Sequence, residues 1–305
     1  MKWTYAVVGS GSIGLYYGAK LTRSGVPVKF LMRSGLEDAR RCGIRVQGEE
    51  EQFVVRDPMV FASPEEMAPV DVVVLALKST SNDLIDHLVG PLFGQSTRIL
   101  TLQNGLGGTE MLASKFGPHR IYGGLCFVCL TRDAPASVQH LGHGTITLGA
   151  YKKEPNDDLR RLAGDFQGAG VETQIADSLE EAQWRKLTWN IAFNGLSIAR
   201  GAVSVDQLLQ NPETHAELCA LMNETLSIAS ALGHEMDPGI IEFHLKRTRA
   251  MGEYRPSSLI DYLAGRKIEL ETIWGNPMRA AVRAGVRAPH LAALYEELRS
   301  ITAWH

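Results

Sequence analysis

A lysine and two asparagines are spaced four residues apart within residues 178–200, at Lys186, Asn190 and Asn194. In a helix this spacing aligns the three side chains on one face. When a hydride is delivered to a ketone carbon, an ammonium group can protonate or stabilise the oxygen atom that gains charge. Carboxamides can hydrogen-bond the rest of such a molecule. The pattern fits a site for carbonyl reduction, but in isolation it fits a solvated polar face with an extended Lys186 side chain better.

One long helix over residues 178–200 is predicted to carry these side chains. Its buried face is predicted from apolar residues at helical spacing, namely Trp184, Leu187, Ile191 and Leu196. Ser178, followed three residues later by Glu181, has the form of a capping box that starts a helix. The chain reads as strands alternating with helices before this stretch and as helices only after it. The helix therefore begins the second of two domains.

Length and composition narrow the class of protein. A chain of 305 residues with 45% apolar and 21% charged residues is typical of a globular protein with about two domains. The net charge of −3 gives no reason to expect nucleic acid or an anionic membrane as partner. No apolar run approaches the roughly 18 residues that span a bilayer, and the first residues lack the layout of a signal peptide. A cytoplasmic, soluble protein is expected.

The cysteines and histidines do not suggest a metal or redox site. The four cysteines are too few for a disulfide framework in a chain of this length. Cys126 and Cys129 form a C-x-x-C pattern, but they lie in a predicted strand, where positions three apart point to opposite faces. His140 and His143 have no accompanying cluster of carboxylates or cysteines. We therefore expect no metal.

A glycine-rich loop near the start of the chain predicts dinucleotide binding. Residues 5–8 form a short apolar run typical of a buried parallel strand, and a helical pattern follows the loop. The loop has the G-x-G-x-x-G pattern and consists of Gly9, Ser10, Gly11, Ser12, Ile13 and Gly14. In this context the glycines permit a tight turn, close approach of pyrophosphate and close packing of helix and strand.

Three further side chains follow predicted parallel strands. Arg33 follows a strand predicted at residues 27–32. Lys78 directly follows the apolar run of residues 70–77, and Asn104 follows a strand predicted at residues 98–102. Ligands of open parallel sheets bind beyond the carboxyl ends of the strands, so the three are expected at one edge with the glycine loop. An arginine where NAD-binding proteins carry an acidic residue favours NADP, through its 2′-phosphate. Taken singly, each residue also fits an ordinary surface loop or turn.

The overall prediction is an α/β Rossmann-like N-terminal domain followed by an all-α C-terminal domain. Residues 1–177 form the dinucleotide-binding domain, and residues 178–305 form a helical substrate and catalytic domain. In the second domain, Ser257 precedes a helix predicted at residues 259–263, and Glu269 begins a helix predicted at residues 268–284. In isolation these two residues fit a helix cap and a carboxylate at the positive end of a helix dipole. An apolar helix face in this domain is compatible with a core or with a homodimer.

Together these motifs resemble the 2-dehydropantoate 2-reductase (ketopantoate reductase) family. The resemblance includes the glycine loop, Arg33, Lys78, and the sequence Gln-Asn-Gly at Asn104. It also includes V-x-H-x-G-x-G-x-I-x-x-G over residues 138–149, W-R-K-L-x-x-N-x-x-x-N over residues 184–194, and P-S-S-L-x-D-x-x-A-G-R-x-x-E, which ends at Glu269. The chain departs from some members in having Ser81 near the cofactor and no further asparagine in residues 199–204.

The resemblance implies a role for each matching residue. Lys186 would be the general acid and Glu269 would bind substrate and help to hold the lysine. Asn190, Asn194 and Ser257 would contact substrate. Asn104 would lie beside the nicotinamide, Arg33 would bind the 2′-phosphate, and Lys78 would lie at the cofactor.

The implied activity is NADPH-dependent reduction of 2-dehydropantoate to pantoate, in pantothenate and coenzyme A biosynthesis. One alternative is a related NADP-dependent reductase or dehydrogenase that acts on a different 2-oxo or hydroxy acid. A second alternative is a non-catalytic NADP-sensing protein, which would have no reason to keep the lysine and the glutamate.

Overall fold

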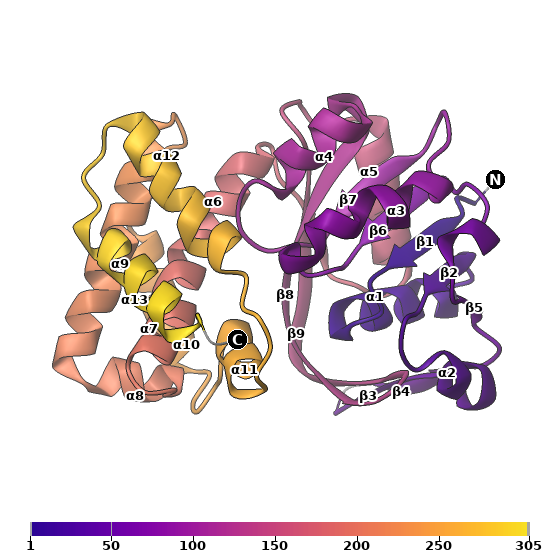
Figure 1. Cartoon of the computed structure of the whole chain (residues 1–305), viewed down its shortest axis with the longest axis horizontal. Coiled ribbons are helices and arrows are strands. Elements are labelled where there is room, and N and C mark those ends of the chain that lie inside the picture. Colours follow the sequence, from indigo (N-terminus) through magenta and orange to yellow (C-terminus); the bar gives the residue numbers. More distant parts are fainter. Residues whose placement is uncertain (1, 50, 304–305) are drawn as a thin grey trace. The chain divides into compact units, whose positions relative to one another are not determined.

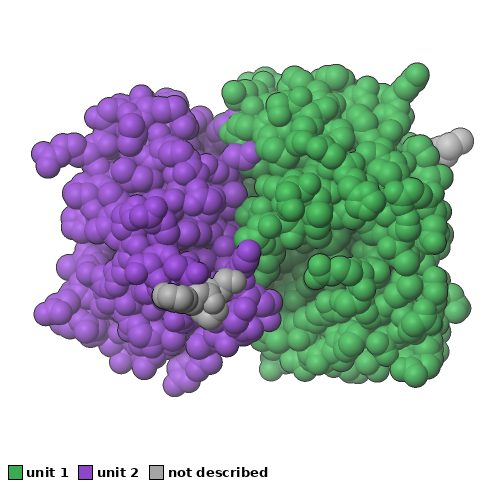
Figure 2. Space-filling view, in the orientation of Figure 1, with its two compact units in different colours: residues 1–103, 108–179 green, residues 104–107, 180–305 purple. Residues whose placement is uncertain are grey.

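The computed structural model describes residues 2–49 and 51–303, which form a sheet covered by helices and a separate helical part (Figure 1). They divide into two compact units (Figure 2). Unit 1 comprises the residues up to 103 and residues 108–179, and unit 2 comprises residues 104–107 and the residues from 180 onward. The α/β Rossmann-like and all-α parts are those that the sequence predicts. The grouping of residues 104–107 with the helical unit has no counterpart in the sequence pattern.

A single mixed sheet forms the centre of unit 1. Its order in the described residues is β4-β3-β9-β8-β7-β6-β1-β2-β5, with β10 paired to β9. The bounds are β1 (Tyr5–Val8), β2 (Val28–Leu31), β3 (Ile44–Gly48), β4 (Gln52–Val55), β5 (Met59–Phe61), β6 (Val72–Leu75), β7 (Arg98–Thr101), β8 (Ile121–Ala134), β9 (Ser137–Ala150) and β10 (Thr173–Ile175). The run β5-β2-β1-β6-β7-β8 is parallel. It has the 3-2-1-4-5-6 order of dinucleotide-binding sheets, and the order reverses between β1 and β6.

The central strands are buried on both faces. Along β1, Tyr5 and Val7 enter a core that also contains side chains of α1 (Ser12–Arg23) and α5 (Asp157–Gly168). Ala6 and Val8 enter a second core, with side chains of α3 (Ile85–Val89) and α4 (Gly108–Phe116). Because successive residues of a strand point to opposite faces, a strand between two cores is apolar throughout. This explains why the central strands are visible in the sequence as continuous apolar runs.

Strands β8 and β9 form one long curved hairpin that reaches β3, β4 and helix α2 (Leu36–Cys42) (Figure 1). The prediction of separate strands at residues 137–141 and 145–148 is wrong, because β9 continues through the glycine-rich turn between them. The irregularity is accommodated by shifts in register with β8, and His143 there has φ +59°. Such bulges bend and twist a strand without ending it.

Unit 1 also contains short 3₁₀ helices between strands and helices. They are η1 (Pro64–Glu66), η2 (Ser79–Leu84), η3 (Gly90–Leu92) and η4 (Pro118–Arg120). Among the residues that the structure describes in both units, no helix combines the length and the apolar character needed to cross a membrane.

Unit 2 is built around the predicted long helix. Its elements are α6 (Leu179–Trp189), η5 (Asn190–Asn194), α7 (Gly195–Ala199), α8 (Val205–Gln210), α9 (Pro212–Ala231), α10 (Ile240–Arg249), α11 (Ser257–Leu263), η6 (Glu271–Gly275), α12 (Asn276–Ala284) and α13 (Pro289–Ile301). Elements α6, η5 and α7 are consecutive and contribute buried apolar residues to a core shared with α9, α12 and α13.

The predicted helices of unit 2 need three corrections. Helix α11 begins at Ser257 and not at residue 259, because Pro256 caps it in an extended conformation. Helix α8 is absent from the sequence-based prediction, although Ser204 and Gln207 form a capping box at its start. The long helix and the helix predicted at residues 268–284 both contain a π-helical turn, η5 and η6.

Candidate active site

The glycine loop of unit 1 has the shape that a pyrophosphate group needs. Gly9 has φ +105°, and a Cβ built on it would lie 2.5 Å from the backbone nitrogen of Leu77. A Cβ on Gly14 would lie 2.0 Å from the carbonyl oxygen of Gly9, so α1 packs tightly on the loop. At Gly11, which caps α1, no atom lies within 4 Å of the corresponding position. The loop is therefore closed toward the protein and open at the helix N-terminus, as phosphate binding requires.

The other predicted cofactor residues of unit 1 surround the ends of β1, β2 and β6. Ser10, Ser12 and Ile13 lie half-buried in the glycine loop. Arg33 follows β2 by two residues and is exposed, and within residues 2–49 and 51–303 nothing pairs with its guanidinium group. Lys78 follows β6 by three residues, is half-buried, and precedes η2. Because β2, β1 and β6 are adjacent parallel strands, these residues share the carboxyl edge of the sheet.

In unit 2, Asn104 connects Lys186 to Glu269. Lys186 Nζ donates a hydrogen bond to Asn104 Oδ1 at 2.9 Å. Asn104 Nδ2 donates in turn to Glu269 Oε2 at 3.3 Å. Glu269 is only 8% exposed, and Lys186 is half-buried. The two residues that the sequence singled out for proton chemistry are thus 83 positions apart in the chain (269 − 186) and share one hydrogen-bonding partner.

The segment that carries Asn104 is held against η6. The Leu106 amide donates to the Thr272 carbonyl at 2.9 Å, and Asn276 Nδ2 donates to the Leu106 carbonyl at 2.6 Å. Gly105 has φ +83°, and a Cβ there would lie 2.2 Å from the Thr272 carbonyl oxygen. Only glycine fits this approach. Asn276 is not predicted as a site residue from the sequence, although Asn-Pro at residues 276–277 is a recognisable helix start.

A π-helical turn changes the spacing of the site side chains. Asn190 and Asn194 are the first and last residues of η5. The indole of Trp274 donates to the Ile191 carbonyl at 3.0 Å and so satisfies a backbone group within the widened turn. Inserting a residue into a helical turn alters which side chains share a face, and such turns recur at functional sites. The predicted alignment of Lys186, Asn190 and Asn194 on one face of a single α-helix is therefore interrupted after Lys186.

The carboxamides have different surroundings. Asn194 is 1% exposed, and its Oδ1 accepts hydrogen bonds from the Ser258 amide at 2.9 Å and from Ser257 Oγ at 3.5 Å. It therefore fixes the start of α11. Asn190 is 7% exposed, yet within the described part of the chain its side-chain amide has no hydrogen-bond partner. The amide of Asn190 is therefore available to hydrogen-bond a bound polar molecule.

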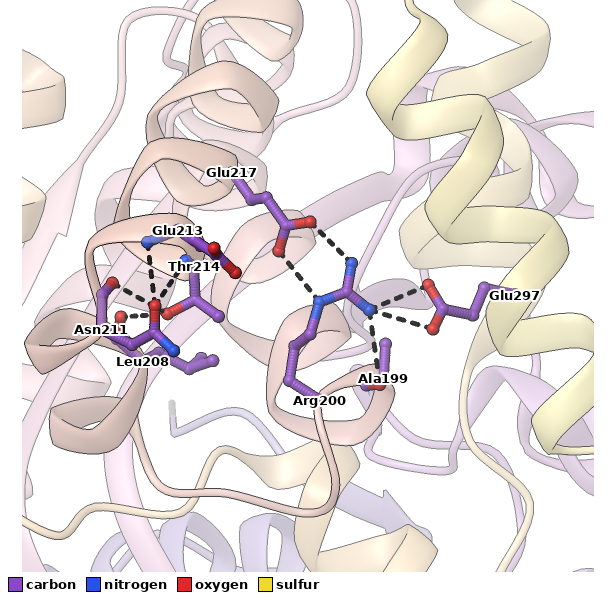
Figure 3. Close-up of polar contacts among 8 residues, drawn as sticks. All are labelled: Ala199, Arg200, Leu208, Asn211, Glu213, Thr214, Glu217 and Glu297. Atoms are coloured by element: carbon purple, nitrogen blue, oxygen red, sulfur yellow. Dashed lines mark hydrogen bonds and ion pairs between the residues drawn. The ribbon is translucent and has the colours of Figure 1, made fainter.

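The stretch that lacks a further asparagine contains Arg200, which anchors the end of the site helix (Figure 3). Its guanidinium group donates to both carboxylate oxygens of Glu217 on α9, from Nε at 2.9 Å and from Nη2 at 2.8 Å. Its Nη1 donates to Glu297 on α13, at 3.0 and 3.1 Å. The hydrogen bond from Arg200 lowers the pKa of Glu217, and the two carboxylates raise the pKa of Arg200. Arg200 thus ties α7 to α9 and α13.

Replacing Arg200 with methionine is expected to lower the free energy of unfolding by about 1 kcal/mol, because partly exposed ion pairs contribute roughly 0.2–1 kcal/mol each. For a chain of this size the loss corresponds to a fall in Tm of roughly 2–4 °C. Thermal melts would measure it, with Arg299→Met as the matched control, since Arg299 forms one exposed pair with Glu296. Equal melting temperatures for the two variants would contradict the anchoring role.

His244 on α10 supports the backbone beside Lys186. It is 7% exposed, and its Nε2 lies 3.2 Å from the Arg185 carbonyl oxygen. Burial, together with the nearby charges of Arg247 and Arg185, lowers its pKa from 6.5 to about 4, although the hydrogen bond to the Arg185 backbone opposes the shift. The imidazole is therefore neutral near pH 7 and donates through Nε2–H.

This shift predicts acid sensitivity. Between pH 6.5 and about 4 the unfolded chain binds a proton at His244 that the folded chain does not, so the free energy of unfolding falls as the pH falls. The full loss is about 3 kcal/mol, from 1.36 kcal/mol per pKa unit. The His244→Gln variant keeps a hydrogen-bond donor but does not titrate. Its free energy of unfolding, measured with urea at pH 7, 5.5 and 4.5, should therefore lack this dependence on pH. The exposed His87→Gln variant should retain it, and equal slopes in the two variants would contradict the assignment.

Comparison with known proteins identifies the family. The chain matches the family model for ketopantoate reductase PanE/ApbA over residues 5–153 and that for its C-terminal part over residues 178–302. It is 36% identical over 300 residues to 2-dehydropantoate 2-reductase of Nostoc sp., covering 97% of this chain and 94% of that protein.

Solved structures agree. The crystal structure of 2-dehydropantoate 2-reductase from Geobacter metallireducens GS-15 matches with a TM-score of 0.95 and 38% identity, covering 97% of this chain and 99% of that one. The corresponding structure from Methylococcus capsulatus matches with a TM-score of 0.91 and 30% identity, covering 98% and 97%. The chain belongs to the ketopantoate reductase family and is an oxidoreductase that uses a nicotinamide cofactor.

Proposed function

We propose that this protein catalyses the NADPH-dependent reduction of 2-dehydropantoate to pantoate, a step of pantothenate and coenzyme A biosynthesis. Family membership supports the reaction class. The observation that carries the proposal is the hydrogen-bonded series Lys186–Asn104–Glu269, in which an ammonium group is oriented by a buried amide and carboxylate. A protein that only senses the nucleotide has no need for this arrangement.

The proposed chemistry assigns the proton transfer to Lys186. A nicotinamide cofactor, when bound, would supply the hydride that the ketone carbon of the substrate accepts. Lys186 Nζ donates a proton to the ketone oxygen, so that the carbonyl group becomes a secondary alcohol and the lysine is left neutral. Before transfer the ammonium group stabilises the charge that develops on the oxygen. Asn104 fixes the lysine side chain, and the nearby Glu269 carboxylate favours the charged form of the amine.

The carboxamides and the hydroxyl group are proposed to hold the substrate. Asn190 offers a donor and an acceptor without a protein partner in the described residues. Ser257 is exposed and lies next to Asn194, so its hydroxyl group can turn toward a bound carboxylate. Glu269 can accept a hydrogen bond from the substrate hydroxyl group. These side chains would fix the orientation of the ketone relative to Lys186, which is how enzymes convert binding into rate.

The proposed cofactor site lies on unit 1. The glycine loop would hold the pyrophosphate group, Arg33 the 2′-phosphate and Lys78 the neighbouring part of the cofactor. We accordingly propose residues 1–177 as the dinucleotide-binding domain and residues 178–305 as the substrate and catalytic domain. A nicotinamide contact of Asn104, a homodimer and a cytoplasmic location stay predictions.

A steady-state assay tests the proposal. The loss of NADPH absorbance is followed with 2-dehydropantoate and with a panel of other 2-oxo acids, and each series is repeated with NADH. We expect the highest kcat/KM for NADPH with 2-dehydropantoate. Faster turnover of another 2-oxo acid would replace the substrate and keep the chemistry. Binding of NADPH without turnover of any acid would favour a non-catalytic protein.

A further inference from the structure

A second arginine, on the β8–β9 hairpin, contacts the residue that follows Arg33. Arg132 Nη2 is 3.5 Å from the hydroxyl oxygen of Ser34, the residue that follows Arg33. Its Nε lies 3.4 Å from the Ala134 carbonyl oxygen, which directs the guanidinium group toward the loop after β2. Arg132 is half-buried, whereas Arg33 and Ser34 are exposed. Segments about 100 positions apart in the chain (132 − 33 = 99), the loop after β2 and the end of β8, thus each carry an arginine, and the second of these arginines contacts Ser34.

The contact between the two segments is built into the backbone. Gly35 has φ +79°, and a Cβ on it would lie 3.0 Å from Pro135 Cβ and 3.2 Å from Arg132 Nη2. The hairpin turn is fixed by β3, since the Arg45 amide donates to the Ala136 carbonyl at 2.9 Å. The position of Arg132 therefore follows from the sheet register and from close packing at Gly35.

In the part of the chain that the structure describes, acidic residues lie near the two arginines in sequence but do not pair with them. Asp133 directly follows Arg132 and is exposed. The nearest acidic residues in the chain after Ser34 are Glu37 and Asp38, on α2. Each forms an ion pair within its own helix, Glu37 with Arg40 at 2.9 Å and Asp38 with Arg41 at 3.0 Å. In the described residues no carboxylate pairs with Arg33 or Arg132. Two arginines that pair with no carboxylate of the described residues, together with a hydroxyl group, are suited to a phosphate monoester, which offers three acceptor oxygens.

We propose that Arg132 is a second specificity determinant for the 2′-phosphate of NADP(H), and that it forms with Arg33 and Ser34 a phosphate clamp. This inference rests on the proposed use of NADPH. In dinucleotide-binding sheets, the residue that recognises the 2′ position of the ribose lies in the loop after the second strand. The proposal adds to this site a residue from the far end of the β8–β9 hairpin. The clamp recognises the phosphate and not the hydride-transferring end of the cofactor, so fragments that lack nicotinamide can test it.

The test compares the binding of 2′-phospho-ADP-ribose and of ADP-ribose by isothermal titration calorimetry, without catalysis. We expect the native protein to bind the phosphorylated fragment more tightly. Arg132→Gln should weaken binding of that fragment about tenfold, which is the loss of one charge-assisted hydrogen bond at the low end of its range. Binding of ADP-ribose should stay unchanged and shows that the variant is folded. Arg132→Lys should restore part of the lost affinity, because it keeps the charge but not the fork of donors.

Two variants complete the experiment. Arg33→Gln should behave like Arg132→Gln, and the double variant should bind the two fragments equally. Arg160→Gln is the matched control, an exposed arginine of unit 1 on α5. If Arg33→Gln weakened binding of the phosphorylated fragment and Arg132→Gln did not, the proposed role of Arg132 would be wrong and that of Arg33 would stand. A native protein that does not distinguish the fragments would overturn the clamp together with the proposed preference for NADPH.

Discussion

Replacement of Lys186 by alanine is expected to lower kcat/KM for 2-dehydropantoate by roughly 10²–10⁴-fold, the usual contribution of a general acid. The variant should still bind NADPH, because the glycine loop and Arg33 belong to unit 1 and Lys186 belongs to unit 2. Added alkylamines should restore part of the rate, since a small ammonium ion can occupy the space of the missing side chain. The measurement is the pH dependence of kcat/KM with and without amine.

Two further variants separate proton transfer from charge. Lys186→Arg keeps a cation but cannot give up a proton near neutral pH. It should stay far below the native rate if Lys186 is the acid. Lys246→Ala removes an exposed lysine from α10 in the same unit and should be unchanged. A Lys186→Ala variant within about tenfold of the native kcat/KM would exclude the acid role.

The sequence predicts what depends on local pattern. The glycine loop, the buried central strands and the helix that carries Lys186 each follow from spacing within some 20 residues. These are also where the structure agrees with the prediction, because propensity, periodicity and turn chemistry favour the same conformation there. Lys186, Glu269 and Asn104 could be singled out by residue type, although they lie far apart in the chain.

What the sequence does not predict depends on tertiary contacts. The π-helical turn at Asn190 is stabilised by the indole of Trp274, 84 positions later (274 − 190), and no local pattern reveals that partner. The position of Asn104 in the helical unit depends on Leu106 and Asn276. Arg132 approaches Ser34 only because β9 pairs with β3 and the hairpin curves. In each case a long-range hydrogen bond or packing contact decides the arrangement, so periodicity alone could not reveal it.

Asn104 provides the second large effect, because it is the shared partner of the proposed acid and its carboxylate. Asn104→Asp keeps an acceptor for Lys186 Nζ but loses the donor to Glu269 Oε2 and places a like charge beside it. A hydrogen bond to a charged group contributes about 1.5–3 kcal/mol, so we expect kcat/KM to fall by roughly 10–150-fold. Asn223→Asp, which adds the same charge at an exposed position on α9, should leave the rate unchanged.

The direction in which the pH profile of kcat/KM shifts shows whether residue 104 acts on Lys186 or whether its replacement only disrupts the site. A carboxylate at position 104 stabilises the protonated amine of Lys186. The loss of activity at high pH should therefore begin at a higher pH in Asn104→Asp than in the native enzyme. Asn104→Ala removes both hydrogen bonds without adding charge, so it should be slow and show no such upward displacement. If Asn104→Asp retained the native rate and the native pH profile, the amide would not orient Lys186. The proton would then be supplied by a lysine that needs no support from Glu269 through residue 104.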